Sequence, residues 1–225
     1  MYAERGRGVP DKLVGGTYSE KELVHHRRSR LGTRGHARMQ LTDPAVIGSL
    51  FGASEFALLL TRRAASGARA ADDGSLRQIW IVILISLIAA VAASIIVPWA
   101  GSALLVRLRT GGALLFLAGL LLRAYAIVYL GRFFTVNVAL AADHRLIDTG
   151  PYRYVRHPSY SGALLEFIGL GITLGNWLSL LLLLVPTWLV FERRMSIEER
   201  ALSKALGSDY TDYMARAKRL IPGVY

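Results

Sequence analysis

The sequence contains no cysteine among its 225 residues. Disulfides, thiolate metal sites and cysteine nucleophiles are therefore excluded. Histidine is also scarce: five are present, and only His25 and His26 are adjacent, within a polar segment. Zinc sites need spaced sets of cysteine, histidine or carboxylate ligands, and the histidines show no such spacing. We therefore expect no metal site.

Acidic residues are few as well, 16 against 27 lysines and arginines, which gives a formal net charge of +11. Such a balance can indicate a nucleic-acid partner. Here, however, the basic residues flank apolar segments instead of alternating with aromatic residues. That placement is typical of membrane proteins, whose cytoplasmic loops are basic and attract anionic lipid headgroups. We expect the lipid bilayer as a partner, and no nucleic acid.

The N-terminal residues 1–43 are polar and rich in glycine and arginine, unlike the rest of the chain. No apolar segment typical of a signal peptide precedes a cleavage site. We expect a disordered basic tail. An alternative is that Met39 is the natural start and that the residues before it are an extension.

Long apolar segments dominate the remainder, and hydrophobic residues make up 53% of the chain. Residues 79–99 are 21 positions without a charge, enough for a helix to span a bilayer core of about 30 Å. Residues 112–130 are long enough but contain Arg123. Residues 45–60 are short and contain Glu55, so the sequence leaves open whether they span.

Two shorter apolar segments, residues 163–175 and 177–191, are separated only by Asn176. They predict a helical hairpin with Gly175 and Asn176 at its tip. Pro186 should kink the second arm, because proline removes one backbone donor and clashes with the preceding turn. A hairpin returns the chain to the side that it left, so the two segments flanking it should share one arginine-rich cytoplasmic face.

The predicted fold is an all-α integral membrane protein with four or five transmembrane helices, a C-terminal helical hairpin and cytoplasmic amphipathic helices. Residues 44–130 are expected to form the N-terminal transmembrane helices, and residues 131–225 the part that carries the chemistry. In the tail we expect one amphipathic helix over residues 192–206, ended by Gly207. A second should be capped by Ser208 and should stop before Pro222.

The most informative motif runs from Gly150 to Gly162 and reads Gly-Pro-Tyr-Arg-Tyr-Val-Arg-His-Pro-Ser-Tyr-Ser-Gly. A loop that only joins membrane helices has no need of so many aromatic and cationic groups at fixed spacing. The motif resembles the isoprenylcysteine carboxyl methyltransferase family of integral-membrane enzymes, which use S-adenosylmethionine. The resemblance continues downstream at Arg194, Glu198, Glu199, Leu202, Gly207, Tyr210, Tyr213 and Pro222.

The resemblance implies methyl transfer from S-adenosylmethionine to a lipidic acceptor, such as the carboxylate of a prenylcysteine or an isoprenoid acid. It assigns Arg194 to the acceptor, as the catalytic and substrate-binding residue. It assigns the cofactor to a pocket on the cytoplasmic face. The residues implied for that pocket are Asn137, His144, Arg145, Leu146, Ile147, Tyr152, His157, Pro158, Ser159, Tyr160 and Glu198.

The chemistry of such a reaction explains why an arginine suits the acceptor site. An ionised carboxylate needs no general base, because its unperturbed pKa is about 4. It needs orientation beside the methyl carbon, which the planar donors of arginine provide. Arg194 and Glu198 are one helical turn apart, so one helix could hold acceptor and cofactor side by side. The same spacing also suits an ordinary surface ion pair.

Arg123 and Glu166 lie within apolar segments, where an ionisable group is costly and faces a partner or a cavity. They could pair with each other, or Arg123 could reach toward the interface. Our hypothesis places Arg123 in the substrate cavity. Arg153 and Arg156 are expected to contact lipid headgroups. A lipidic acceptor is expected to reach the site through the bilayer, between the helix at residues 112–130 and the hairpin.

Three other classes stay open from the sequence. Membrane sterol-type reductases share a similar arginine-histidine-proline segment and use NADPH, but the pattern around Arg194 and Glu198 fits them less well. Phospholipid N-methyltransferases use a similar motif with an amine acceptor, which must be deprotonated. A non-catalytic membrane scaffold is the third.

Overall fold

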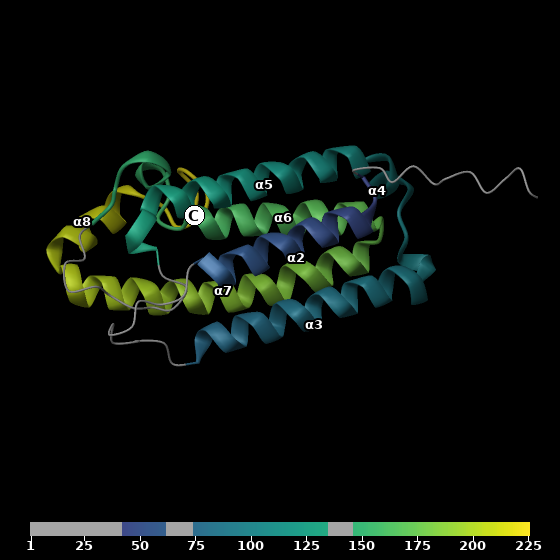
Figure 1. Ribbon diagram of the computed structural model, residues 1–225, viewed down its shortest axis with the longest axis horizontal. Coiled ribbons are helices and arrows are strands. Elements are labelled where there is room, and N and C mark those ends of the chain that lie inside the picture. Colours follow the sequence, from purple (N-terminus) through teal and green to yellow (C-terminus); the bar gives the residue numbers. More distant parts are fainter. Residues whose placement is uncertain (1–41, 62–73, 135–145) are drawn as a thin grey trace, which may run out of the picture. The chain divides into compact units, whose positions relative to one another are not determined.

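The computed structural model describes residues 42–61, 74–134 and 146–225, all within the unit Gln40–Tyr225. Every named element in this part is helical, which confirms the all-helical fold (Figure 1). The α-helices are α2 (Pro44–Thr61), α3 (Ser75–Ile96), α4 (Ala103–Arg107), α5 (Arg109–Leu130), α6 (Pro158–Leu174), α7 (Trp177–Leu206) and α8 (Ser208–Arg216). Three short 3₁₀ turns accompany them, η1 (Pro98–Ala100), η2 (Gly131–Phe133) and η3 (Gly150–Arg153).

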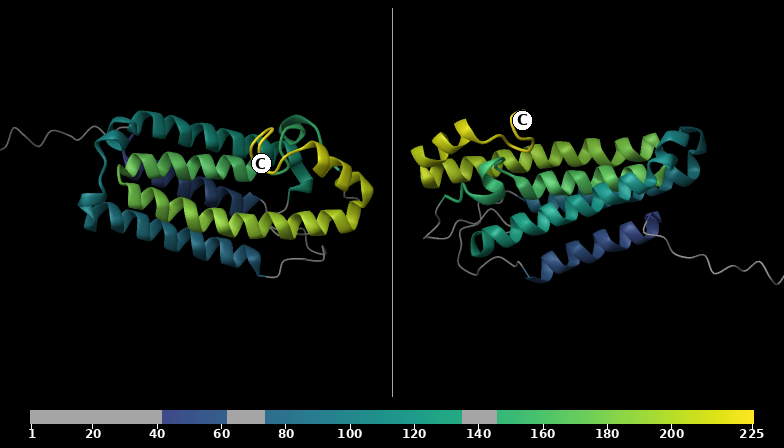
Figure 2. Two further views of the ribbon diagram at one scale, coloured as in Figure 1. Left: turned by 180° about the vertical axis from the view of Figure 1, so that it is seen from behind. Right: turned by 90° about the horizontal axis from the view of Figure 1, so that it is seen from above.

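The long helices run side by side, with α5 along α6, α6 along α7 and α7 along α3 (Figures 1 and 2). Helix α2 packs less extensively, mainly on α6, where the rings of Phe51 and Phe167 lie 5.2 Å apart. One hydrophobic core joins these helices. Its buried residues are Ile47, Phe51, Ile79, Ile83, Ala90, Ala113, Phe116, Ala163, Phe167, Leu170, Leu183, Val190 and Phe191.

Two of the described helices, α3 and α5, are long and apolar enough to cross a membrane. Their outer faces carry large exposed hydrophobic side chains, among them Ile85, Ile88 and Ile95 on α3 and Leu121 and Val128 on α5. A surface of this kind is costly in water and suited to lipid. The predicted total of four or five spans, and the division of the chain at residue 130, stay predictions.

Helix α3 begins four residues before the predicted apolar segment and ends three residues before Trp99. Pro98 explains the end, because proline disfavours helical geometry in the residue before it. Val97 accordingly leaves the helix with φ −116° and ψ 64°. The boundary of the apolar segment and the boundary of the helix therefore differ.

The predicted hairpin tip is confirmed. Gly175 ends α6 in the left-handed conformation, with φ 70°, which glycine adopts without steric cost. Asn176 then caps α7 by accepting a hydrogen bond from the Ser179 amide at 3.1 Å. The Asn176 side chain also donates to the Val97 carbonyl at 3.0 Å, and so ties the tip to the end of α3.

The prediction of a separate helix over residues 192–206 is wrong. Helix α7 is continuous from Trp177 to Leu206 and passes through Pro186 without a break in its assignment. No glycine or proline lies between Phe191 and Gly207 to stop it. Gly207 does end the helix, with φ 59°, but it also precedes α8 directly, so Ser208 is the first residue of α8 and not its cap. Helix α8 ends at Arg216, well before Pro222.

A seam of glycines brings α5 and α6 into backbone contact. A Cβ atom added to Gly119 would lie 2.5 Å from the Gly162 carbonyl oxygen, and one added to Gly169 would lie 2.5 Å from that of Gly112. Small residues permit this approach between membrane helices. The seam leaves no space for a lipid chain between α5 and α6 at these turns. The expected access route between α5 and the hairpin as a whole stays a prediction.

Replacing Gly119 or Gly169 by alanine should therefore destabilise the bundle by about 1–3 kcal/mol, because backbone must move apart to admit the methyl group. Gly111 on the same helix offers a matched control, since nothing lies within 4 Å of its added Cβ. Gly111→Ala should be neutral or slightly stabilising. Thermal unfolding in detergent measures both, and equal melting temperatures for all three variants would contradict the seam.

Candidate functional site

The motif that begins at Gly150 forms a folded turn on the end of α5. Gly150 has φ 58°, and a Cβ there would lie 2.4 Å from the ring of Tyr129, so glycine is required on both counts. The Tyr152 hydroxyl donates to the Ala126 carbonyl of α5 at 3.3 Å. The Tyr213 hydroxyl of α8 donates to the Tyr152 carbonyl at 2.6 Å. The turn is thus held between α5 and α8.

The next part of the motif pairs with the C-terminal tail. The amides of Arg156 and His157 donate to the carbonyls of Lys218 and Arg219 at 2.7 and 3.0 Å. The Ser161 hydroxyl donates to the Leu220 carbonyl at 2.7 Å. These bonds confirm that the loop before the hairpin and the tail after it meet on one side.

Glu199 collects charged groups from both segments. Its carboxylate accepts from Arg156 Nε at 2.9 Å and from Arg219 Nη2 at 2.6 Å, and it lies 3.2 Å from His157 Nε2. Burial alone would raise the pKa of this carboxyl, but the hydrogen bonds with His157 and Arg219 and the charge of Arg156 lower it to about 2. Glu199 lies beyond the apolar part of α7, and it joins loop, helix and tail.

Arg156 is therefore not the headgroup contact that we predicted. Its side chain is 11% exposed, and besides the bond to Glu199 it donates to the carbonyls of Met214 and Ala217. Arg153, by contrast, is exposed. The two arginines of the motif have different roles because only one of them faces the carboxylate on α7.

Glu198, one residue before Glu199, is the centre of a second cluster of polar side chains. It accepts from the Tyr160 hydroxyl at 2.7 Å and from Arg194 Nε at 2.9 Å, and it lies 3.5 Å from His157 Nδ1. The structure thus brings together four of the predicted site residues: His157, Tyr160, Arg194 and Glu198. Pro158 and Ser159 open α6 beside them.

Arg194 is 1% exposed, which rules out an ordinary surface pair with Glu198. Its Nη1 donates to the Ser75 hydroxyl, the first residue of α3, at 2.5 Å. One position earlier, Arg193 Nη1 donates to Gln78 Oε1 at 2.8 Å in an exposed setting. Ser75 was not among the predicted site residues, because it belongs to no motif and precedes the apolar segment at residues 79–99.

The predicted cofactor residues divide into three groups. Asn137, His144 and Arg145 lie outside the described residues. Leu146 packs on the small cluster of Tyr210, Tyr213 and Ala217, and Ile147 is half-buried beside it in sequence. His157 and Tyr160, with Pro158 and Ser159 between them at the start of α6, contact Glu198 of α7, and Tyr152 is buried within the turn.

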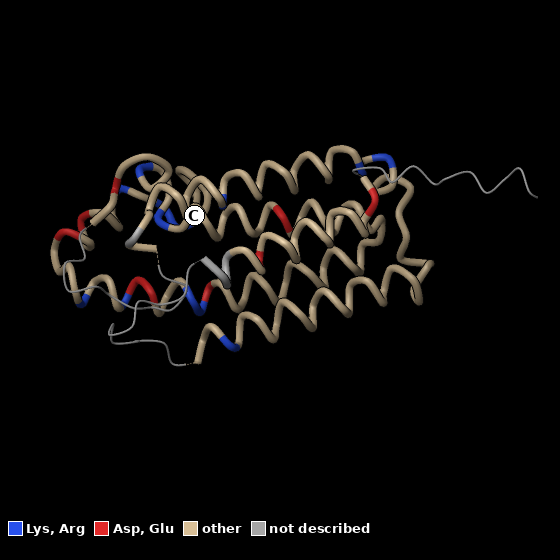
Figure 3. The backbone as a smooth tube through the Cα atoms, in the orientation of Figure 1, with Lys and Arg blue, Asp and Glu red and all other residues tan. Residues whose placement is uncertain are grey.

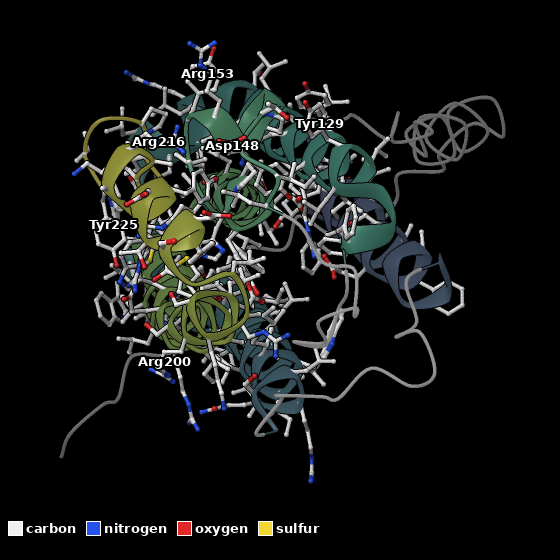
Figure 4. The ribbon with its side chains drawn as sticks, turned by 90° about the vertical axis from the view of Figure 1, so that its left-hand side faces the viewer. Tyr129, Asp148, Arg153, Arg200, Arg216 and Tyr225 are labelled. Atoms are coloured by element: carbon white, nitrogen blue, oxygen red, sulfur yellow. The ribbon has the colours of Figure 1, made fainter. Side chains whose placement is uncertain are left out.

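A cleft of about 180 Å³ opens at this end of the unit, lined by Asp148, Arg153, Tyr213, Arg216 and Ala217. Figure 4 views this end and shows Asp148, Arg153 and Arg216 close together. Asp148 and Arg216 form an exposed ion pair at 3.3 Å. Within the described part of the chain, no three histidine or acidic side chains are grouped to hold a metal ion.

Arg123 has acidic partners on two helices. It pairs with Glu55 of α2 through both terminal nitrogens, and its Nη1 lies 3.7 Å from Glu166 of α6. The pairing with Glu166 was among the expected alternatives, whereas the partner Glu55 was missed. The cluster ties α2 to the α5–α6 pair, and a role of Arg123 in substrate binding stays a prediction.

Residues 112–204 match the family model of the isoprenylcysteine carboxyl methyltransferase (ICMT) family. The resemblance is thereby confirmed for this segment. Among similar proteins is protein-S-isoprenylcysteine O-methyltransferase B of Arabidopsis thaliana, 34% identical over 115 residues, 50% of this chain and 58% of the relative. Protein-S-isoprenylcysteine O-methyltransferase of Schizosaccharomyces pombe is 39% identical over 106 residues, 46% of this chain and 45% of the relative.

A solved structure of the eukaryotic intramembrane Ras methyltransferase ICMT is also similar, with a TM-score of 0.59 and 25% identity, over 80% of this chain and 65% of that one. The chain spans about half the length of the relatives that it matches in sequence. The matched segment holds His157, Tyr160, Arg194 and Glu198, but neither Ser75 nor the tail that pairs with the motif.

Replacing Glu199 by glutamine should lower the free energy of unfolding by about 3 kcal/mol, because the largely buried Arg156 would lose its paired carboxylate, while Arg219 keeps Glu192. Asp148→Asn is the control, since it breaks an exposed pair and should cost below about 1 kcal/mol. The lowered pKa adds a pH test. Ionised Glu199 contributes fully to the free energy of unfolding above about pH 4.5, and this contribution is lost as the pH falls toward 2.

Denaturant unfolding in detergent across this pH range measures both effects. Wild-type protein should lose stability on acidification more steeply than the Glu199→Gln variant. Parallel curves would show that Glu199 is not the carboxylate that holds the segments together.

Proposed function

We propose that this protein is an integral-membrane, S-adenosylmethionine-dependent carboxyl O-methyltransferase whose acceptor is a lipidic carboxylate, in the first place a prenylcysteine. The observation that carries the proposal is the cluster of Arg194, Glu198, Tyr160 and His157 inside the segment that matches the ICMT family. Both relatives named above are isoprenylcysteine O-methyltransferases, which supports a carboxylate acceptor.

Arg194 is the residue that we assign to the acceptor. Its guanidinium is buried and is held in place by bonds at Nε and Nη1, so it does not reorganise when a carboxylate arrives. Planar donors fix a carboxylate in one orientation, and an ionised carboxylate requires no base. Burial strengthens the attraction, because water does not screen it. Arg194 therefore orients the oxygen that attacks.

S-adenosylmethionine, when bound, supplies an electrophilic methyl group on a sulfonium. Glu198 is a carboxylate that could face this cation, because its side chain is 22% exposed. The side chain of the neighbouring Glu199 is 8% exposed and is already paired with Arg156 and Arg219. Glu198 would hold the cationic part of the cofactor, and Tyr160 and Leu146 would hold its flat and apolar parts. The described cleft of about 180 Å³ is smaller than ligand pockets of about 300–1,000 Å³ and is not lined by Glu198.

We propose a multi-pass membrane protein with the site at the cytoplasmic end. Charged residues gather where α7, α8 and the motif meet, and few lie along the middle of the helices (Figure 3). Basic residues of membrane proteins concentrate on the cytoplasmic side. A reductase using NADPH and a phospholipid N-methyltransferase, which the sequence left open, find no support among the similar proteins.

The central test replaces Arg194 by lysine, which keeps the charge but loses the planar pair of donors. We expect turnover of a prenylcysteine to fall at least about 100-fold, in the range seen when one preorganised donor is removed, with affinity for S-adenosylhomocysteine nearly retained. Glu198→Gln should instead mainly weaken S-adenosylhomocysteine binding. The two residues are hydrogen-bonded, so the double variant should show coupling.

Arg193→Lys is the matched control. Arg193 precedes Arg194 on the same helix and also bonds to α3, but in an exposed setting. Its variant should keep turnover within about 2-fold, because surface substitutions cost little. Wild-type turnover in Arg194→Lys would remove Arg194 from the site and leave the proposal without its main residue.

A further inference from the structure

The contact between Ser75 and Arg194 lies partly outside the segment that matches the family. Ser75 is the first residue of α3 and is 2% exposed. Its hydroxyl oxygen lies 2.5 Å from Arg194 Nη1, across 119 positions of sequence. Arg194 is assigned to the acceptor, so the N-terminal half of the chain reaches the acceptor site at this point.

The position of Ser75 is set by the whole contact between α3 and α7. At the far end of α3, the Ser179 hydroxyl donates to the Ala90 carbonyl at 2.6 Å and Asn176 donates to the Val97 carbonyl. At the near end, Gln78 bonds to Arg193. Hydrogen bonds at both ends fix the register of α3 along α7. The contact between Ser75 and Arg194 is therefore a consequence of how the two long helices pack.

Bonds from two different helices orient the guanidinium. Arg194 Nε donates to Glu198 one turn along α7, and Nη1 donates to Ser75 on α3. The Nε bond comes from the same helix, whereas the Nη1 bond ties the group to a second helix and restrains the tilt of its plane. A bidentate carboxylate contact depends on the plane of the fork.

We propose that Ser75 is a positioning residue of the acceptor site, which acts by fixing the plane of the Arg194 guanidinium. The inference rests on the proposed function, and it assigns part of acceptor recognition to a helix that the family model does not cover. The N-terminus of α3 also favours binding of the acceptor, because its partial positive charge attracts a nearby carboxylate. Ser75 should affect recognition of the carboxylate and leave the cofactor contacts of Glu198 unchanged.

The test compares binding of N-acetyl-S-farnesylcysteine with binding of its methyl ester. The two compounds have the same lipid, but only the acid carries the carboxylate that Arg194 is proposed to bind. Calorimetry on the full chain in lipid nanodiscs gives the ratio of the two affinities. Wild-type protein should favour the acid. Ser75→Ala should reduce this preference about 10-fold, the effect of losing a hydrogen bond to a charged group. Ser75→Thr, which keeps the hydroxyl, should restore it.

Gln78→Ala is the matched control, because it removes the neighbouring bond between the same two helices. It should leave the acid-to-ester ratio within about 2-fold of wild type, as expected for an exposed bond. S-adenosylhomocysteine affinity should be the same in every variant. If Ser75→Ala does not fold, Ser75→Cys takes its place, since a thiol fills the same space and accepts only weakly.

The outcomes separate the two claims. A wild-type protein that binds acid and ester equally would overturn the proposed carboxylate site itself. A wild-type preference that survives in Ser75→Ala would overturn the role of Ser75 and leave the proposed function standing. Equal losses in Ser75→Ala and Gln78→Ala would also overturn it, because the cause would then be the packing of α3 and not the hydroxyl.

Discussion

The structure depends on two consecutive carboxylates, Glu198 and Glu199, at the end of α7 where the apolar surface gives way to charge. Because adjacent residues on a helix point in directions about 100° apart, the two face different partners. Glu199 holds Arg156 and Arg219, and so fastens the motif to the tail. Glu198 faces Tyr160 and Arg194. His157 lies between the two, 3.5 Å from Glu198 and 3.2 Å from Glu199.

Close contacts between the long helices support this arrangement. Glycines let α5 and α6 touch backbone to backbone, and Asn176 and Ser179 bind α7 to α3 at the opposite end from the site. Helix α7 carries this order without interruption into the polar region, since it continues from Trp177 to Leu206. Arg194 therefore lies on a long continuous helix and is also bonded to α3. For the proposed acceptor contact this support matters, because a shift of about 1 Å can cost a large part of a catalytic rate.

The sequence predicted those features that depend on local signals. Gly175 and Asn176 marked the hairpin tip, because left-handed geometry and helix capping are properties of single residues. The spacing of Arg194 and Glu198 predicted their contact. Most long-range partners were not predictable in this way, although the pairing of Arg123 with Glu166 was among the alternatives. Glu55 beside Arg123, Glu199 beside Arg156 and Ser75 beside Arg194 join residues 43 to 119 positions apart, and only helix packing brings them together.

The central claim is that this end of the helical unit binds a methyl donor and not a nicotinamide cofactor. Titration of S-adenosylhomocysteine and of NADPH into purified protein in lipid nanodiscs tests it most directly. The account predicts saturable, one-to-one binding of S-adenosylhomocysteine, weakened when Glu198 is replaced, and no binding of NADPH. Saturable binding of NADPH, with S-adenosylhomocysteine showing none, would contradict the account.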